Sequence, residues 1–195
     1  MRTAKINRKT KETDVTVEIN LDGSGEYQID TGIGFFDHML AQIAVHGLFD
    51  LSLKAKGDLH IDFHHTVEDC GLTLGAVFAQ ALGDKSGIVR AASAFVPMDE
   101  ALGQAIVDFS GRPFSVINIG WTSPMVGGLE TTLLEHFFQS FAVTSASNLH
   151  LISHYGKDNH HIAESLFKAF ARAASAAVQI DPRRQGRIPS SKGVL

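Results

Sequence analysis

His64-His65-Thr66-Val67-Glu68-Asp69 and His160-His161-Ile162-Ala163-Glu164-Ser165 are two copies of one motif, a histidine pair followed by a glutamate. A second repeated feature lies upstream, in Phe35-Phe36-Asp37-His38-Met39 and Leu133-Leu134-Glu135-His136-Phe137. The upstream histidine precedes the pair by 26 residues in the first copy and by 24 in the second. Two features in the same order at nearly the same spacing indicate an internal duplication. We therefore divide the chain into halves at 1–88 and 89–180, followed by a tail at 181–195.

Both halves have the same order of hydrophobic patterns. Alternating apolar residues predict strands, over 13–20, 27–30 and 51–55 and again over 101–108, 114–119 and 148–153. Apolar residues at helical spacing predict helices, over 35–45 and 64–82 and again over 129–143 and 160–178. These patterns predict an α+β fold of two β-rich halves. Each half is expected to form a roughly four-stranded sheet covered on one face by two helices.

The overall composition is that of a globular protein. The chain has 195 residues, 44% of them hydrophobic, and a net charge of −4, which gives no basic excess for binding nucleic acid. It has no apolar run long enough for a membrane span, and its first residues lack the apolar block of a signal peptide. The single cysteine, Cys70, excludes an internal disulfide. We expect a cytoplasmic protein with no nucleic-acid or membrane partner.

The repeated histidines predict metal binding. Residues four apart share one face of a helix, so His64 should lie beside Glu68, and His160 beside Glu164. The second histidine of each pair points about 100° away, so the two histidines of a pair should serve different metal ions or sites shared between subunits. Together with the upstream histidines, the candidate ligands are His38, His64, His65, Glu68, His136, His160, His161 and Glu164.

The arrangement and identity of the metal follow from the same pattern. We expect each motif to work with the upstream histidine of its own half, so that the duplicated unit is a half-site. Imidazole and carboxylate ligands without thiolate favour Mn²⁺. A lone helical histidine beside an acid would instead be a surface pair or lie in a capped first turn. The other histidines lack a repeated context and are expected to be non-ligands; they are His46, His60, His150 and His154.

These motifs, with Arg8-Lys9-Thr10-Lys11-Glu12-Thr13 and Pro189-Ser190-Ser191-Lys192-Gly193, resemble the imidazoleglycerol-phosphate dehydratase family from about residue 3 to the C-terminus. The resemblance implies an enzyme of histidine biosynthesis that converts imidazoleglycerol phosphate to imidazole acetol phosphate. It implies the same eight ligands and two manganese ions per active site. It also implies trimers that assemble into a 24-subunit shell, with active sites at subunit interfaces.

The implied reaction removes a hydrogen that no neighbouring carbonyl acidifies. The substrate's own imidazole is the available electron reservoir, and a metal on one ring nitrogen lowers the pKa of the ring N–H. The resulting metal-bound imidazolate could expel the neighbouring hydroxyl, after which loss of a C–H proton gives an enol. Carboxylates near the metals should carry the protons. Glu12, Asp99 and Glu164 are the catalytic candidates, with the acid and base roles open among them.

The substrate phosphate requires fixed positive charge, which arginine supplies with bidentate geometry. The candidate substrate-binding residues are Glu12, Gln42, Arg90, Arg112, Lys168, Ser190 and Lys192. The basic tail at 181–195 is expected to close over the phosphate. A solvated basic tail would have the same composition.

Two other functions are compatible with these features. A dinuclear metal phosphate-ester hydrolase would share the paired metals and the basic residues, although it would rely more on aspartate ligands. A non-enzymatic metal-storage shell would share the metal sites but would not need the phosphate-binding residues.

Overall fold

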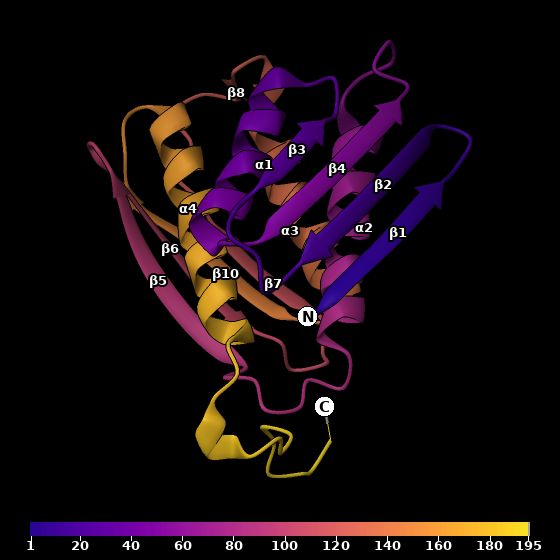
Figure 1. The fold of residues 1–195 in the computed structure, drawn as a ribbon. Coiled ribbons are helices and arrows are strands. Elements are labelled where there is room, and N and C mark those ends of the chain that lie inside the picture. Colours follow the sequence, from indigo (N-terminus) through magenta and orange to yellow (C-terminus); the bar gives the residue numbers. More distant parts are fainter. Residues whose placement is uncertain (195) are drawn as a thin grey trace.

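Residues 1–194, which the computed structural model describes, form two four-stranded sheets of identical topology (Figure 1). The first has the order β1-β2-β4-β3 and contains β1 (Thr3–Lys9), β2 (Thr13–Asn20), β3 (Tyr27–Asp30) and β4 (Asp50–Gly57). The second has the order β5-β6-β10-β7 and contains β5 (Ala91–Met98), β6 (Ala101–Asp108), β7 (Phe114–Asn118) and β10 (Asn148–Tyr155). In each sheet the last strand of the order pairs in parallel and the other pairs are antiparallel. The predicted α+β fold of two matching halves is confirmed.

Four α-helices of the described residues lie between the sheets (Figure 1). They are α1 (Gly34–Gly47), α2 (His64–Leu82), α3 (Thr131–Ser145) and α4 (Asn159–Val178). Helices α1 and α2 contact the first sheet, and α3 and α4 contact the second. Across the centre, α1 packs against α4 and α2 packs against α3, so the helices of the two halves share one core.

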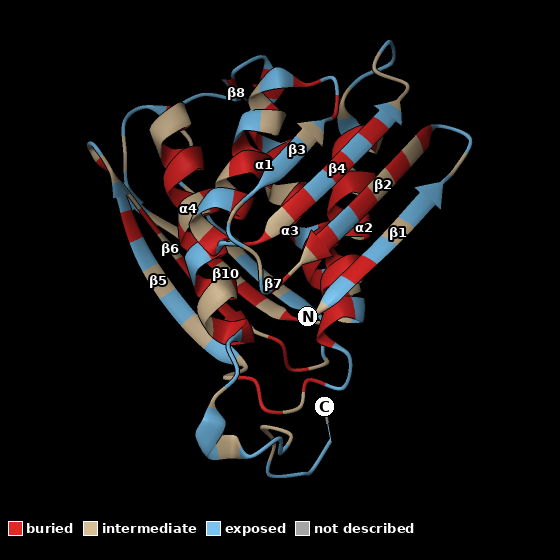
Figure 2. Cartoon of the chain, in the orientation of Figure 1, coloured by how far each residue is buried: buried red, intermediate tan, exposed pale blue. Residues whose placement is uncertain are grey.

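The central layer is held by apolar and aromatic packing. Figure 2 shows buried residues on the helix faces and on alternate positions of the strands. The ring of Phe137 in α3 lies 5.3 Å from that of Phe36 in α1 and 5.6 Å from that of Phe167 in α4. Helices α2 and α3 approach closely at Gly71 and Gly75, where an added Cβ would lie 2.6 Å from the backbone oxygen of Phe137 and 2.4 Å from that of Phe141. The helices are therefore fixed relative to one another by tight contacts between the halves.

The helices begin at one end of the molecule, and the tail lies at the other (Figure 1). The small hairpin β8 (Met125–Val126) and β9 (Leu129–Glu130) precedes α3, and a 3₁₀ helix at Pro182–Arg184 begins the tail. Because every candidate motif lies in the first turns of a helix, this arrangement gathers the motifs at one end. No helix within residues 1–194 has the length and apolar character needed to cross a bilayer.

Candidate metal centres and active site

One cluster of candidate ligands joins α1 to the start of α4, and we call it the α1–α4 cluster; it consists of His38, His160 and Glu164. The Nε2 atoms of both histidines lie 3.2 Å from Oε2 of Glu164. The other oxygen of Glu164 lies 2.6 Å from Nζ of Lys168. Burial by itself would raise the pKa of Glu164, but the hydrogen bonds from Lys168 and His38 outweigh it and lower that pKa. Glu164 is therefore held as a carboxylate, the form that binds a cation.

A second cluster joins α2 to α3, and we call it the α2–α3 cluster; it consists of His64, Glu68 and His136. His64 Nε2 lies 3.9 Å from Glu68 Oε2, and His136 Nε2 lies 3.5 Å from Glu68 Oε1. The Nε2 atom of His136 is buried and has no hydrogen-bond partner within residues 1–194. A buried ring nitrogen normally has a partner, so this atom fits a metal ligand.

Both clusters have the dimensions of a metal site. In each, one ligand atom per residue can be chosen such that all lie within 4.8 Å of one another. The donors are imidazole nitrogens and carboxylate oxygens, a set that suits first-row divalent metals. The residues present therefore fit a bound divalent ion at each cluster.

Each cluster takes residues from both halves, which corrects the expectation that a motif works with the upstream histidine of its own half. His38 contacts the motif of the second half, and His136 contacts the motif of the first half. The cause is the helix packing: α1 lies against α4 and α2 against α3, so the start of each helix meets its neighbour from the other half. The duplicated unit is therefore not a half-site that functions alone.

The second histidine of each motif points away from the clusters. The ring centroids of His64 and His65 are 6.1 Å apart with their planes at 85°, and those of His160 and His161 are 6.2 Å apart at 79°. This divergence agrees with the 100° turn per residue of a helix. Within one chain, the described residues therefore place His65 and His161 outside the two clusters.

Both of these histidines are held by a carboxylate from outside their helix. His65 Nδ1 lies 3.0 Å from Asp58 Oδ2, and His161 Nδ1 lies 2.6 Å from Glu100 Oε2. These hydrogen bonds are the main reason that the pKa of each histidine is raised. Neither Asp58 nor Glu100 was among the residues predicted from the sequence. Asp58 could have been found as an acid placed directly after the strand that leads to the first motif, whereas Glu100 lies in the β5–β6 turn, which is far from the second motif in the sequence.

The candidate proton carriers Glu12 and Asp99 occupy equivalent turns, β1–β2 and β5–β6. Glu12 is close enough to His65 for its charge to help raise the pKa of that histidine. Asp99 Oδ2 lies 3.7 Å from Nε2 of His161, and its side chain is 75% exposed. Asp99 also has a positive φ of 46°, a conformation that aspartate tolerates better than most residues. Each carboxylate thus lies near a second histidine, whereas Glu164 lies inside a cluster.

Apart from Glu12, which lies in the β1–β2 turn, the candidate substrate-binding residues fall into two groups. Gln42 and Lys168 lie beside the α1–α4 cluster; Gln42 Nε2 is 3.2 Å from the backbone oxygen of His38. The other group lies at the tail end of the molecule and consists of Arg90, Arg112, Ser190 and Lys192. Glu164 and the end of α4 at Val178 are 14 residues apart, which corresponds to about 21 Å along the helix axis. One chain therefore does not bring this second group to its own metal clusters.

The tail end contains a basic cavity of about 710 Å³, lined by Arg90, Asp181, Arg183, Arg184, Arg187, Ile188, Pro189, Ser190 and Ser191. The guanidinium of Arg90 donates to both oxygens of Asp108, at 2.6 and 2.9 Å, and to the backbone oxygen of Pro189 at 2.8 Å. Arg90 thereby ties the tail to the end of β6. Arg112 is exposed in the turn before β7.

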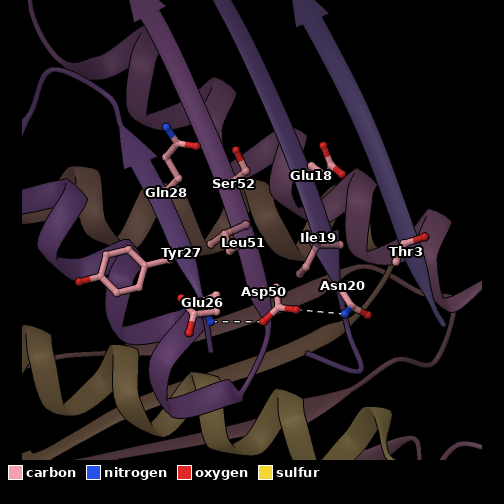
Figure 3. Close-up of a pocket in the computed structure, with 10 residues that line it drawn as sticks. All are labelled: Thr3, Glu18, Ile19, Asn20, Glu26, Tyr27, Gln28, Asp50, Leu51 and Ser52. Atoms are coloured by element: carbon pink, nitrogen blue, oxygen red, sulfur yellow. Dashed lines mark hydrogen bonds between the residues drawn. The ribbon is translucent and has the colours of Figure 1, made fainter. Parts of the chain in front are cut away.

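A further hollow, of about 420 Å³, lies on the first sheet (Figure 3). Its lining includes Glu18, Tyr27 and Ser52, and it includes none of the candidate ligands or substrate-binding residues. Asp50 at its edge instead accepts hydrogen bonds from Asn20 and from the backbone of Glu26, which stabilise the local turn. This hollow is separate from the candidate site.

The fold and the two histidine–carboxylate clusters define a class: an internally duplicated α+β protein with paired candidate metal centres. The family model described as imidazoleglycerol-phosphate dehydratase matches residues 31–174. The chain is 56% identical over 194 residues to the imidazoleglycerol-phosphate dehydratase of Zymomonas mobilis. This match covers 100% of this chain and 99% of the relative. It is 54% identical to that of Gluconacetobacter diazotrophicus, covering 100% and 98%.

Solved structures of imidazoleglycerol-phosphate dehydratases are similar to this chain as well. The imidazoleglycerol-phosphate dehydratase of Pyrococcus furiosus, in complex with (S)-C348, superimposes with a TM-score of 0.84 at 33% identity, covering 97% of this chain and 100% of that one. The Staphylococcus aureus enzyme gives 0.83 at 32%, covering 92% and 99%. This chain belongs to the imidazoleglycerol-phosphate dehydratase family, the hydro-lyases of histidine biosynthesis.

Proposed function

We propose that this protein catalyses the Mn²⁺-dependent elimination of water from imidazoleglycerol phosphate to give imidazole acetol phosphate, with two metal ions per active site. The observation that carries the proposal is the pair of clusters at the start of the four helices. The family membership supports dehydration over hydrolysis of a phosphate ester. The dominance of histidine over aspartate in the clusters supports the same choice.

The metal ions would be held by the eight candidate ligands. His38, His160 and Glu164 would hold one ion and His64, Glu68 and His136 the other, with His65 and His161 serving ions bound to neighbouring subunits. A bound divalent metal supplies a Lewis acid that lowers the pKa of the substrate's imidazole N–H. The lack of any thiolate ligand supports Mn²⁺ as the native ion.

The active site would form between subunits. Two observations support this: the end of α4, where the tail begins, lies about 21 Å along the helix axis from Glu164, and the second histidines point away from the clusters. Assembly of trimers into a 24-subunit shell would bring the tail of one chain to the clusters of another. We propose 1–88 and 89–180 as the repeat units and 181–195 as the closing tail, of which residue 195 lies outside the described residues.

The substrate would be oriented by residues from both groups. Arg90, Arg112, Lys168, Ser190 and Lys192 would bind the phosphate, and Glu12 and Gln42 would contact the remainder. Proton transfer would fall to Glu12 and Asp99, because both are exposed in turns beside a second histidine. Glu164 would serve as a ligand, because its hydrogen bonds with Lys168 and His38 favour the carboxylate. The buried Cys70 supports a reducing, cytoplasmic location.

The test is an assay of the Mn²⁺-reconstituted protein on imidazoleglycerol phosphate with analysis of the products. An enolisable ketone that retains its phosphate supports the dehydratase. Release of free phosphate would identify a hydrolase. Stoichiometric Mn²⁺ binding without any turnover would favour the storage shell. Sizing the protein with and without a chelator then tests the proposed assembly.

A further inference from the structure

The second histidine of each motif has its Nδ1 atom bonded to a carboxylate and its Nε2 atom on the opposite side of the ring, where the exposed Asp99 Oδ2 lies 3.7 Å from Nε2 of His161. Asp58, which follows β4, is the hydrogen-bond partner of Nδ1 of His65. Glu100, in the β5–β6 turn, is the partner of Nδ1 of His161. A carboxylate cannot donate a hydrogen bond when ionised, so each ring must place a proton on Nδ1. In a neutral imidazole, this leaves the lone pair on Nε2.

The two carboxylates are anchored differently. Glu100 Oε1 accepts hydrogen bonds from the backbone N–H groups of Lys157 and Asp158, at 3.0 and 2.8 Å, while Oε2 faces His161. Asp158 in turn caps α4 by accepting from the N–H of His160 at 2.7 Å. Both oxygens of Glu100 are therefore committed, and the contact is tied to the start of α4.

Asp58 is committed through only one oxygen. Its Oδ2 faces His65, whereas Oδ1 is buried with no hydrogen-bond partner within residues 1–194. Both histidines therefore present Nδ1 to a carboxylate, but the carboxylate of Glu100 is held by more hydrogen bonds than that of Asp58.

We propose that Asp58 and Glu100 are positioning residues that hold His65 and His161 as Nδ1–H tautomers and thereby keep Nε2 available to a metal ion. The proposal rests on the proposed function for the presence of the ion. Hydrogen bonds from a ligating histidine to a carboxylate fix both the tautomer and the ring orientation, and their loss costs about 10–100-fold in metal affinity. Glu100 controls the tautomer more strictly than Asp58 does, because both of its oxygens accept hydrogen bonds and an NH₂ group in either position would lose one.

The unequal anchoring makes the two amide variants differ. In Glu100→Gln, the amide oxygen keeps the two backbone N–H donors, so the NH₂ group faces His161 and requires Nδ1 to accept. The proton of that ring then moves to Nε2, the wrong position for a ligand. In Asp58→Asn, the NH₂ group occupies the place of the unpartnered Oδ1, and the amide oxygen keeps the bond from His65. Asp58→Ala removes the side chain, so that residue 58 no longer selects a tautomer of His65.

The direct test is the tautomer itself, read by solid-state ¹⁵N NMR of histidine-labelled, metal-free protein at about pH 9, well above the ordinary histidine pKa. Glu100→Gln should convert one histidine from Nδ1–H to Nε2–H, and Asp58→Asn should convert none. Glu26→Gln, at an exposed acid directly before β3, is the matched control and should leave the spectrum unchanged. An unaltered tautomer in Glu100→Gln would overturn the proposal.

Mn²⁺ titration calorimetry of the same variants gives a second readout that does not depend on turnover. Glu100→Gln and Asp58→Ala should weaken binding about 10–100-fold at the affected ion, and Asp58→Asn should weaken it less. Equal affinities for all variants would refute the positioning role while leaving the dehydratase intact. Absence of Mn²⁺ binding by the unaltered protein would instead contradict the proposed function. If Glu100→Gln fails to fold, the comparison of Asp58→Asn with Asp58→Ala decides the question, and equal effects count against the proposal.

Discussion

His38 and Glu164 are 126 residues apart in the chain, yet His38 Nε2 lies 3.2 Å from Glu164 Oε2. The contact joins the first helix of one half to the last helix of the other. The α2–α3 cluster repeats the relationship in the opposite sense, since His136 of the second half meets Glu68 of the first. Each half therefore contains an incomplete part of both clusters, and the core between the sheets is also the frame of the metal centres.

Removing one upstream histidine should therefore affect the cluster of the other half's motif. His38→Ala should release the ion held by His160 and Glu164, and His136→Ala should release the ion held by His64 and Glu68. Metal content after gel filtration, measured by mass spectrometry, should fall by one ion per subunit in each variant and by both in the double variant.

The matched control for that measurement is His154→Ala. His154 is exposed on β10, where its Nε2 atom lies 2.8 Å from Gln104 Oε1, and it belongs to neither cluster. Its metal content should equal that of the unaltered protein. Loss of the His64–Glu68 ion in His38→Ala, with retention of the other, would show that each motif does work with its own upstream histidine.

The sequence predicted the contacts within one helix of the site, but it did not predict which helices bring the ligands together. The pairing of His160 with Glu164 follows from helix periodicity alone, and so does the divergence of His161. The crossing of His38 to the other half depends on which helices pack together, and that is decided by tertiary contacts.

Besides the short hairpin strands β8 and β9, periodicity also missed one strand of each four-stranded sheet. Strand β1 is an edge strand with mostly polar, exposed residues, and β5 is an edge strand that contains Pro97. Edge strands tolerate both features because one side of the strand has no partner. The supports Asp58 and Glu100 were hidden for a related reason: acids in turns carry no periodic signal, and only the structure shows which ring they reach.

The close approach of α2 to α3 predicts a large effect of adding one methyl group. Alanine is the better helix former by about 1 kcal/mol, but a Cβ at Gly71 would lie 2.6 Å from the backbone oxygen of Phe137, and one at Gly75 would lie 2.4 Å from that of Phe141. Backbone cannot move aside cheaply, so overpacking should dominate. Gly71→Ala and Gly75→Ala should each lower the free energy of unfolding by about 1–3 kcal/mol, measured by urea denaturation.

Gly34→Ala provides the control for this comparison. Gly34 is also helical, at the start of α1, and an added Cβ there would meet no atom within 4 Å. Its stability should be unchanged or slightly raised. If Gly71→Ala were as stable as Gly34→Ala, the two helices would have to be farther apart in solution than they are in this structure.

Cys70 should be chemically silent in the native protein. Its side chain lies in the core with 0% exposure, and burial, with the charges of Asp69 and Asp37, raises the pKa of the thiol. The thiolate is the reactive form, so both access and ionisation oppose reaction. A disulfide reagent such as Ellman's should label no thiol in buffer and one thiol per chain in denaturant. Ser24→Cys, which adds a thiol in an exposed turn, should label at once under the same conditions. Rapid native labelling of Cys70 would reveal frequent opening of the core around α2.

The position of the tail predicts that two inactive chains can restore activity together. A chain ending at Ile188 keeps both clusters and loses Ser190 and Lys192, whereas a chain with His38→Ala and His136→Ala keeps its tail and loses both metal centres. Each should be inactive alone. Because about 21 Å of α4 separates the start of a chain's tail from its own Glu164, we expect a working site to combine the clusters of one chain with the tail of another. Hybrids formed by co-expression should therefore contain some complete sites, and a dehydratase assay on doubly tagged, purified assemblies should detect them.

The control is the same two proteins purified separately and then mixed, since subunits already assembled in the presence of Mn²⁺ have no reason to exchange. Inactive hybrids with both chain types confirmed by mass spectrometry would mean that the tail reaches the clusters of its own chain, which would require it to leave the cavity in which Arg90 holds it.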